Sequence, residues 1–259
     1  MRQFCRLYGE LDRGEGQRAR VEVLASHLQR CDPADAAWTL QLLLGKQRRR
    51  LITARRLRLL AQRITGLPPW LLEACHAQVG DTAETIALLL TAQRGAALGD
   101  QPPAQRSDTA VTDPEPIELP LHRWMELELP RLAALDEEQQ AVALAALWSR
   151  LELQETLVLN KLLTGAFRVG VGPGLVIKAL ARCSGLEESL LQHRLMGPFN
   201  PSAASYAALL APPEADTIPT CRPYPFLLAC PLPPDGLRQH AAADWLVEWK
   251  WDEIGRAHV

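Results

Sequence analysis

The sequence predicts a mainly α-helical fold, with a multi-helix domain followed by the start of an α+β domain, on three observations. Apolar residues recur at spacings of three and four, as on one face of a helix, through residues 1–98 and again through 121–195. The residues between them, 99–120, are rich in Pro, Asp, Gln and Thr, which is typical of a flexible linker. From 196 to 234 the chain is rich in proline, which excludes long helices and indicates a second domain.

The composition is that of a globular protein. Of the 259 residues, 47% are hydrophobic and 22% are charged, as in folded domains. No apolar run reaches the ~20 residues of a membrane-spanning helix, and residues 1–13 lack the pattern of a signal peptide, so we expect a cytoplasmic protein. The six cysteines form no C-x-x-C pair and the six histidines form no metal-binding motif, which predicts neither a metal site nor a disulfide framework.

In the first half of the chain, characteristic end residues mark two helices. Asp32 provides a side-chain cap, Pro33 occupies the first helical position, and Gly45 ends the apolar stripe that follows. Thr53 caps a second helix, which Gly66 and the two prolines after it end. We therefore expect one helix between each pair of end residues.

The rest of the chain follows the same rules until its last stretch. Residues 81–84, Asp-Thr-Ala-Glu, have the pattern of a capping box that starts a third helix. Helical periodicity resumes over 121–195, where the glycines of 165–174 and a later Ser-Gly pair interrupt it. Residues 245–251 are rich in aromatic and β-branched side chains and alternate along the chain, which predicts a β-strand.

A block of basic residues lies in the first half, although the whole chain is nearly neutral with 28 basic and 30 acidic side chains. Residues 36–72 contain no acidic side chain. The members of this basic block are Lys46, Arg48, Arg49, Arg50, Arg55, Arg56, Arg58 and Arg63. Such a block favours contact with nucleic-acid phosphates. The alternative is a solvated helix face whose acidic partners lie on neighbouring elements.

The glycines between two of the predicted helices form a candidate anion site. Gly170, Gly172 and Gly174 are spaced so that backbone N–H groups can approach a ligand, and the N-terminus of the following helix adds partial positive charge. The segment lacks the residues of a P-loop or a Rossmann turn, so we expect a DNA phosphate as its ligand. The supporting charges would be Lys161, Arg168 and Lys178. A tight interhelical turn without a ligand is the alternative.

Near the end of the chain, a lysine lies between two carboxylates in the sequence Glu248-Trp249-Lys250-Trp251-Asp252. Side chains two residues apart on a strand share a face, so this pattern can be a surface ladder of opposite charges. It can also hold a nucleophile, because a lysine whose pKa is lowered by burial or by nearby cations can attack the α-phosphate of ATP. The pattern alone leaves both interpretations open.

Longer stretches of the sequence resemble the helical DNA-binding domain of bacterial ATP-dependent DNA ligases. The stretches that match its first half are 36–38, 44–50, 70–72 and 79–90, and the stretch that matches its second half is 160–171. Residues 222–230 resemble the entry strand of the nucleotidyltransferase domain of this family, and 248–252 fall where its K-x-D-G motif is expected. The resemblance therefore covers nearly the whole chain.

The resemblance implies an all-α domain that binds nicked double-stranded DNA, followed by an adenylylation domain that uses ATP and Mg²⁺. It implies that Lys250 accepts AMP as a lysyl-AMP intermediate, that Glu248 contacts the adenine, and that Trp249 and Asp252 belong to the same cofactor-binding site. The DNA-binding residues would be Arg48, Arg49, Arg50, Lys161, Arg168, Gly170, Gly172 and Lys178. We expect a monomer that acts in DNA repair, replication or recombination.

The sequence departs from the family after Asp252, where the motif has glycine and this chain has Glu253. We therefore expect residues 253–259 to be a non-native tail and the chain to be a truncated ligase, inactive in ligation by itself. The expected domains are 1–98 and 121–195 for the halves of the DNA-binding domain, 99–120 for the linker, and 196–252 for the start of the adenylylation domain. Two other functions stay open: an RNA ligase or capping-type enzyme that also nucleotidylates lysine, and a non-catalytic helical DNA-binding or scaffold protein.

Overall fold

The computed structural model describes residues 1–14, 16–45, 50–99, 118–197 and 199–212, together with the single residues Asp235, Gly236, Ala241, Ala243 and Trp245. These residues form helices and the connections between them, with no strand in the described ranges. The mainly α fold expected from the sequence is confirmed. The strand expected over 245–251 lies outside the described residues, apart from Trp245.

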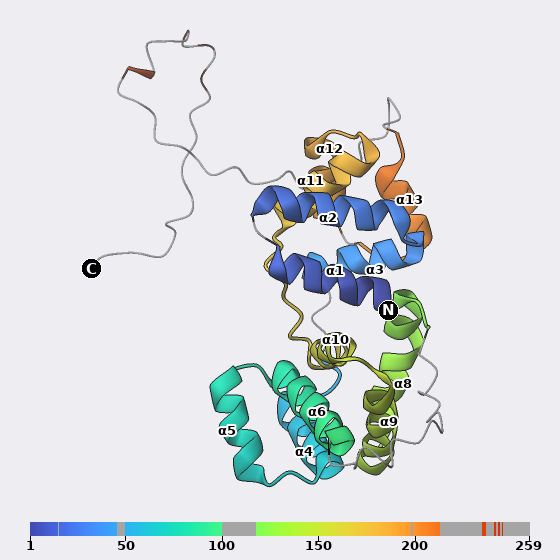
Figure 1. Ribbon diagram of the computed structural model, residues 1–259. Helices are drawn as coiled ribbons and strands as arrows, with labels where there is room; N and C mark the ends of the chain where they lie inside the picture. Colours follow the sequence, from blue (N-terminus) through green and yellow to red (C-terminus); the bar gives the residue numbers. More distant parts are fainter. Residues whose placement is uncertain are drawn as a thin grey trace, which may run out of the picture. The chain divides into compact units, whose positions relative to one another are not determined.

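The chain divides into two compact units, Met1–Pro223 and Tyr224–Val259, and the helices of Figure 1 that carry labels belong to the first unit. The helices of its first half are α1 (Arg2–Arg13), α2 (Gln17–Arg30), α3 (Pro33–Leu43), α4 (Ala54–Thr65), α5 (Pro69–Val79) and α6 (Thr82–Gly99). Their order reproduces the succession of short helices that the periodicity predicts.

The predicted helix ends are present where the sequence placed them. A side-chain oxygen of Asp32 accepts a hydrogen bond from the Ala34 amide at 2.8 Å, and Thr53 caps α4 in the same way. Gly66 ends α4 with a φ of 67°, a left-handed conformation that glycine adopts without strain. At the start of α6, Asp81 accepts from the Glu84 amide at 2.9 Å. Local capping rules therefore describe this half of the fold well.

The second half of the unit begins with a helix that changes type along its length. The helix opens as α7 (Leu121–Arg123), widens to the π-helical segment η2 (Trp124–Glu128) and continues as α8 (Leu129–Ala134). Pro130 is the second residue of α8 and has no N–H to donate to the preceding turn, which disfavours regular α-helical bonding at this point. The remaining helices are α9 (Glu137–Arg150), α10 (Leu153–Thr164), α11 (Pro173–Ser184), α12 (Glu188–Met196) and α13 (Ala203–Leu210).

Helix α10 lies at the centre of the unit, between helices α1 and α6 (Figure 1). It is buried on more than one face: Leu159 and Leu163 are inaccessible to solvent, and so is the polar Asn160. The Asn160 side chain is satisfied on both sides, because it accepts a hydrogen bond from Trp148 Nε1 at 3.1 Å and donates to the Ala83 carbonyl at 3.4 Å. Burial of a polar group with its partners in place is the usual arrangement in a folded core. The segment that follows α10 therefore begins from a helix that the core holds in place.

Helix α13 extends the helical unit beyond residue 195, where we expected the DNA-binding domain to end. It packs on α3 and α12, and Tyr206 donates a hydrogen bond from its hydroxyl to the Leu28 carbonyl at 3.3 Å. Tyr206 and Leu209 are buried in the same hydrophobic core as α1 and α2. The proline-rich composition limits helix length here, but a short apolar helix still fits between the prolines. The expected boundaries at 98, 120, 195 and 252 stay predictions.

Candidate nucleic-acid interface

The connection between α10 and α11, residues 165–172, borders a surface hollow of about 480 Å³. We call this connection the glycine segment. The opposite side of the hollow is the end of α3. The residues that line it are Leu42, Leu43, Leu44, Gly45, Gly165, Phe167, Arg168, Val169, Gly170, Val171 and Gly172. The expected anion site is thus part of a concave surface.

Side chains of α1 and α2 contact the glycine segment and hold it in position. The Phe167 ring contacts the rings of Phe4 and Tyr8, with centroids 5.4 and 5.3 Å away. The Tyr8 hydroxyl donates a hydrogen bond to the Arg168 carbonyl at 3.4 Å, and burial raises the pKa of Tyr8, which keeps the hydroxyl protonated as a donor. Arg20 donates from a guanidinium nitrogen to the Gly170 carbonyl at 3.1 Å.

These contacts set the direction of two peptide groups. In a trans peptide the N–H points opposite to the C=O, so the amides of Val169 and Val171 point away from the donors on α1 and α2. Among the described residues, neither amide donates a hydrogen bond to a protein acceptor. Backbone N–H groups without a partner, next to a helix N-terminus, are the donors that anion sites use.

The chain on either side of residues 46–49, which carry three members of the basic block, lies near this hollow. Residues 46–49, which include the predicted contacts Arg48 and Arg49, lie outside the described residues. Gly45, directly before them, lines the hollow. Directly after them, Arg50 is exposed, and the amides of Leu51 and Ile52 donate to the Leu163 carbonyl at the end of α10, at 3.0 and 2.9 Å. The fold therefore holds the two residues that flank the most basic stretch, Gly45 and Arg50, near the glycine segment.

A scan against protein-family models matches residues 1–181 to the family described as DNA ligase N terminus. The chain belongs to this family. The match spans the basic block and the glycine segment, and it confirms the resemblance to the N-terminal part of an ATP-dependent DNA ligase. A comparison with curated proteins gives no match for the chain. Family membership implies DNA binding, while the preference for nicks, the monomeric state and the cytoplasmic location stay predictions.

In this member of the ligase family, the predicted DNA-binding residues fall into two groups. Arg168, Gly170 and Gly172 are exposed on the glycine segment, and Lys178 is exposed in the second turn of α11. Gly172 is the residue before the first turn of α11. Their positions agree with the geometry expected for a phosphate site. Lys161 forms the second group.

Lys161 is engaged inside the protein. Its side chain is only 11% exposed, and its ammonium nitrogen lies 2.9 Å from a carboxylate oxygen of Asp81 at the start of α6. Burial by itself disfavours the charged form, but the interactions with Asp81 and Tyr8 together outweigh it and raise the pKa of Lys161. Burial acts to raise the pKa of Asp81, but the Glu84 amide, Lys161 and the Ala83 amide together lower it. This geometry favours a structural ion pair over a phosphate contact.

The basic block also divides into free and engaged side chains. Arg58 donates to Thr82 at 3.3 Å and contacts His76 at 3.2 Å, and Arg63 pairs with Glu138 on α9 at 3.5 Å. Arg50 and Arg55 are exposed. An acidic partner on a neighbouring element is therefore present for Arg63, at the end of the block, whereas Lys46, Arg48 and Arg49, at its start, lie outside the described residues.

Two basic residues of α2 escaped the sequence analysis. Arg20 contacts Gly170 as described, and Arg18 lines a small hollow with Lys178 between the starts of α2 and α11. Only the pairing of α2 with α11 brings these residues to the glycine segment. The available local signal was weak, because isolated arginines at the start of a helix have no distinctive spacing.

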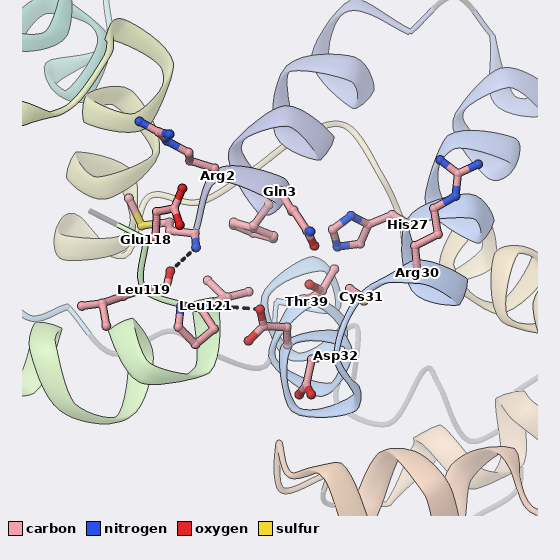
Figure 2. Close-up of a pocket in the computed structure, with 14 residues that line it drawn as sticks. Arg2, Gln3, His27, Arg30, Cys31, Asp32, Thr39, Glu118, Leu119 and Leu121 are labelled. Atoms are coloured by element: carbon pink, nitrogen blue, oxygen red, sulfur yellow. Dashed lines mark hydrogen bonds between the residues drawn. The ribbon is translucent and has the colours of Figure 1, made fainter. Parts of the chain in front are cut away.

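A second hollow, of about 420 Å³, lies near the start of α1 and belongs to the scaffold (Figure 2). Asp35 on its wall accepts hydrogen bonds from the amides of Leu121 and His122, at 3.1 and 2.9 Å, and lies 2.7 Å from His122 Nδ1. The Asp35 carboxylate therefore caps α7. His27 faces the same hollow, and burial lowers its pKa to about 4.

The residues predicted to bind ATP and to carry AMP, Glu248, Trp249, Lys250 and Asp252, lie outside the described residues. Their role and the use of ATP and Mg²⁺ stay predictions. In the described ranges, no group of three His, Cys, Asp or Glu side chains is arranged to hold a metal ion. None of the helices there combines the length and the apolarity that crossing a lipid bilayer demands.

Proposed function

We propose that the glycine segment and the start of the basic block form one surface that binds the backbone of nicked duplex DNA. The observation that supports this most directly is the pair of unpartnered amides, Val169 and Val171, beside the anchored ends of the basic stretch. Amides and the α11 N-terminus offer short-range donors to a phosphate, while Arg50 and Arg168 supply the longer-range attraction.

We also propose that the chain serves an ATP-dependent ligase reaction in which Lys250 is the nucleophile. The lysine nitrogen attacks the α-phosphate of ATP and releases pyrophosphate, and the AMP then passes to the 5′-phosphate at a nick. Attack by the adjacent 3′-hydroxyl closes the strand and releases AMP. The support is membership of the family over residues 1–181 and the position of Lys250 in its motif. The helical surface would contribute by holding the two ends of the nick in position.

Fluorescence anisotropy tests the DNA surface. The 259-residue chain is titrated with nicked duplex, intact duplex and single-stranded DNA over a series of salt concentrations. A triple variant, Arg48→Ala, Arg49→Ala and Arg50→Ala, should bind more weakly and lower the log–log salt slope by about one unit for each phosphate contact that is lost. The matched control is Arg123→Ala with Arg131→Ala, because both arginines are exposed on α7 and α8 and do not line the hollow.

The outcomes separate the possible functions. Stronger binding to nicked than to intact duplex, weakened only by the triple variant, supports the ligase surface. Equal binding to both duplexes favours a general DNA-binding or scaffold role. An absence of duplex binding at low salt, from a chain with the circular dichroism of a folded helical protein, overturns the proposal.

Covalent labelling tests the nucleophile. An enzyme that continues this chain with the rest of a nucleotidyltransferase domain is incubated with ATP and Mg²⁺ and digested. AMP should be found on the peptide with Lys250, and Lys250→Ala should remove the label without changing duplex binding. Label on another lysine, or label that persists in Lys250→Ala, contradicts the assignment.

A further inference from the structure

We infer that Arg20 is the positioning residue of the glycine segment: through the Gly170 carbonyl, it turns the Val171 amide toward the DNA. The inference rests on the proposed function, in which this segment meets a duplex phosphate. It assigns a role in DNA binding to a residue of α2 that belongs neither to the basic block nor to the glycine segment.

The Arg20 side chain lies against the backbone at Gly170. A guanidinium nitrogen donates to the Gly170 carbonyl at 3.1 Å, and the three atoms nearest to a hypothetical Cβ on Gly170 all belong to this guanidinium, at 3.5 to 3.9 Å. In the described ranges, no carboxylate lies within ion-pair distance of Arg20. The carbonyl is therefore its identified hydrogen-bond acceptor, and a charged donor makes that bond stronger than a neutral one.

The backbone conformation of Gly170 needs a restraint from another residue, because glycine has no side chain to limit it. It adopts a φ of +65°, and glycine has access to more backbone conformations than any other residue. The Tyr8 bond to the neighbouring Arg168 carbonyl is 3.4 Å long, which is long for a hydroxyl donor and so weak. The Arg20 bond is thus the stronger of the two that set the orientation of this stretch.

The bond from Arg20 to the Gly170 carbonyl also determines which backbone group faces the ligand. With the Gly170 carbonyl directed at Arg20, the Val171 amide of the same peptide plane points the opposite way. If that peptide turned over, a carbonyl oxygen would replace the amide as the group offered to the ligand. An oxygen repels a phosphate, so loss of Arg20 should weaken binding although Arg20 itself makes no phosphate contact.

The test compares three arginine variants of the 259-residue chain in the anisotropy series with nicked duplex. Arg20→Met should reduce affinity about tenfold, which corresponds to ~1.4 kcal/mol, and leave the salt slope unchanged. Arg168→Met should lower the slope by about one, as expected for a lost phosphate contact. Arg182→Met is the matched control, because Arg182 also joins α11 to α2, 2.5 Å from Glu22, but at the other end of α11. It should leave both affinity and slope unchanged, and Arg20→Lys, which keeps a charged donor, should restore part of the affinity.

A second measurement does not depend on DNA. In amide NMR spectra of the free chain, Arg20→Met should shift the Gly170 and Val171 resonances more than Arg182→Met does. Unchanged resonances, or a salt slope that falls as in Arg168→Met, overturn the positioning role. If no variant and no unchanged chain binds duplex, the proposed function fails, while the NMR comparison still decides whether Arg20 holds the segment.

Discussion

At the scale of single residues, the ion pair between Lys161 and Asp81 shows what charge alone does not reveal about a residue predicted to contact DNA. The pair joins α10 to the first turn of α6, and Lys161 is only 11% exposed. Nothing in the spacing of the sequence links positions 80 residues apart, so the partner became visible only in the fold. An exposed lysine next to a glycine turn and a buried lysine with a partner look the same in one sequence.

The first prediction follows from this pair. Lys161→Met should lower the free energy of unfolding by about 1–3 kcal/mol, because it leaves a partly buried carboxylate without its partner. The salt slope of DNA binding should stay unchanged. Urea unfolding and the anisotropy series measure the two quantities, and a reduced slope with unchanged stability would show that Lys161 contacts phosphate after all.

The pH range of this stabilisation follows from the two pKa shifts. The pKa of Asp81 is lowered in the folded state, so its contribution is present above the ordinary value of 3.8 and is lost as the pH falls through the folded value. The pKa of Lys161 is raised from 10.5, so its contribution is lost only as the pH rises beyond that value. The difference in stability between the unchanged chain and Lys161→Met should therefore be constant through neutral pH.

The second prediction concerns His27, whose pKa is lowered from 6.5 to about 4, mainly by burial and against the attraction of Asp35. The unfolded chain takes up a proton on His27 below pH 6.5, whereas the folded chain does so only near pH 4. The folded state should therefore lose stability as the pH falls between these values, and His27→Gln should remove that part of the loss.

Urea unfolding at pH 7, 5.5 and 4.5 measures this effect as a difference between the two proteins, so that titration of the carboxylates cancels. If the free energy of unfolding of His27→Gln falls with pH in parallel with that of the unchanged chain, the assigned burial of His27 is contradicted. The matched control is His122→Gln, which changes the histidine that pairs with Asp35 and does not itself line the hollow.

At the scale of elements, the glycine segment allows a third prediction that separates ligand approach from folding. Gly172 has a φ of −88°, and a Cβ there meets no heavy atom within 4 Å. Gly172→Ala should change the free energy of unfolding by no more than ~1 kcal/mol but weaken duplex binding several-fold, because the new methyl group occupies the space that a phosphate needs.

Gly197→Ala is the matched control, since Gly197 also has a negative φ and open space around the Cβ position, and it lies after α12. It should leave binding unchanged. If Gly172→Ala binds as tightly as the unchanged chain, phosphate does not approach the backbone at the α11 N-terminus. Anisotropy and thermal unfolding of the same samples supply both readouts.

The helices also show which features the sequence alone could predict and which depend on tertiary packing. Asp32, Thr53 and Gly66 act on the backbone next to them, so the sequence alone located the ends of α3 and α4. The wide turn of η2 depends on packing as well as on Pro130, and no rule of spacing predicted it. The candidate site divides in the same way: the glycines were found by their own pattern, whereas Arg20 and Tyr8 reach them across about 150 residues of chain.

At the scale of the whole molecule, the position of α13 leads to the last prediction, about where the helical unit can be cut. Tyr206 and Leu209 are 7% and 5% exposed, and Arg194 on α12 donates to the Leu209 and Ala211 carbonyls at 2.7 Å. A chain that ends at residue 212 keeps these contacts. It should unfold at the same urea concentration as the 259-residue chain and bind duplex with the same affinity.

A chain that ends at residue 199 loses α13 and uncovers the surface of α3 beneath it. Removal of two buried side chains of this size costs on the order of 3–6 kcal/mol, which is a large part of the stability of a typical domain. The shorter chain should therefore unfold at a clearly lower urea concentration and lose duplex binding when it unfolds. Equal stability of the two truncated chains would mean that α13 contributes nothing to the helical unit, and the DNA-binding domain would then end near residue 195 as the sequence predicted.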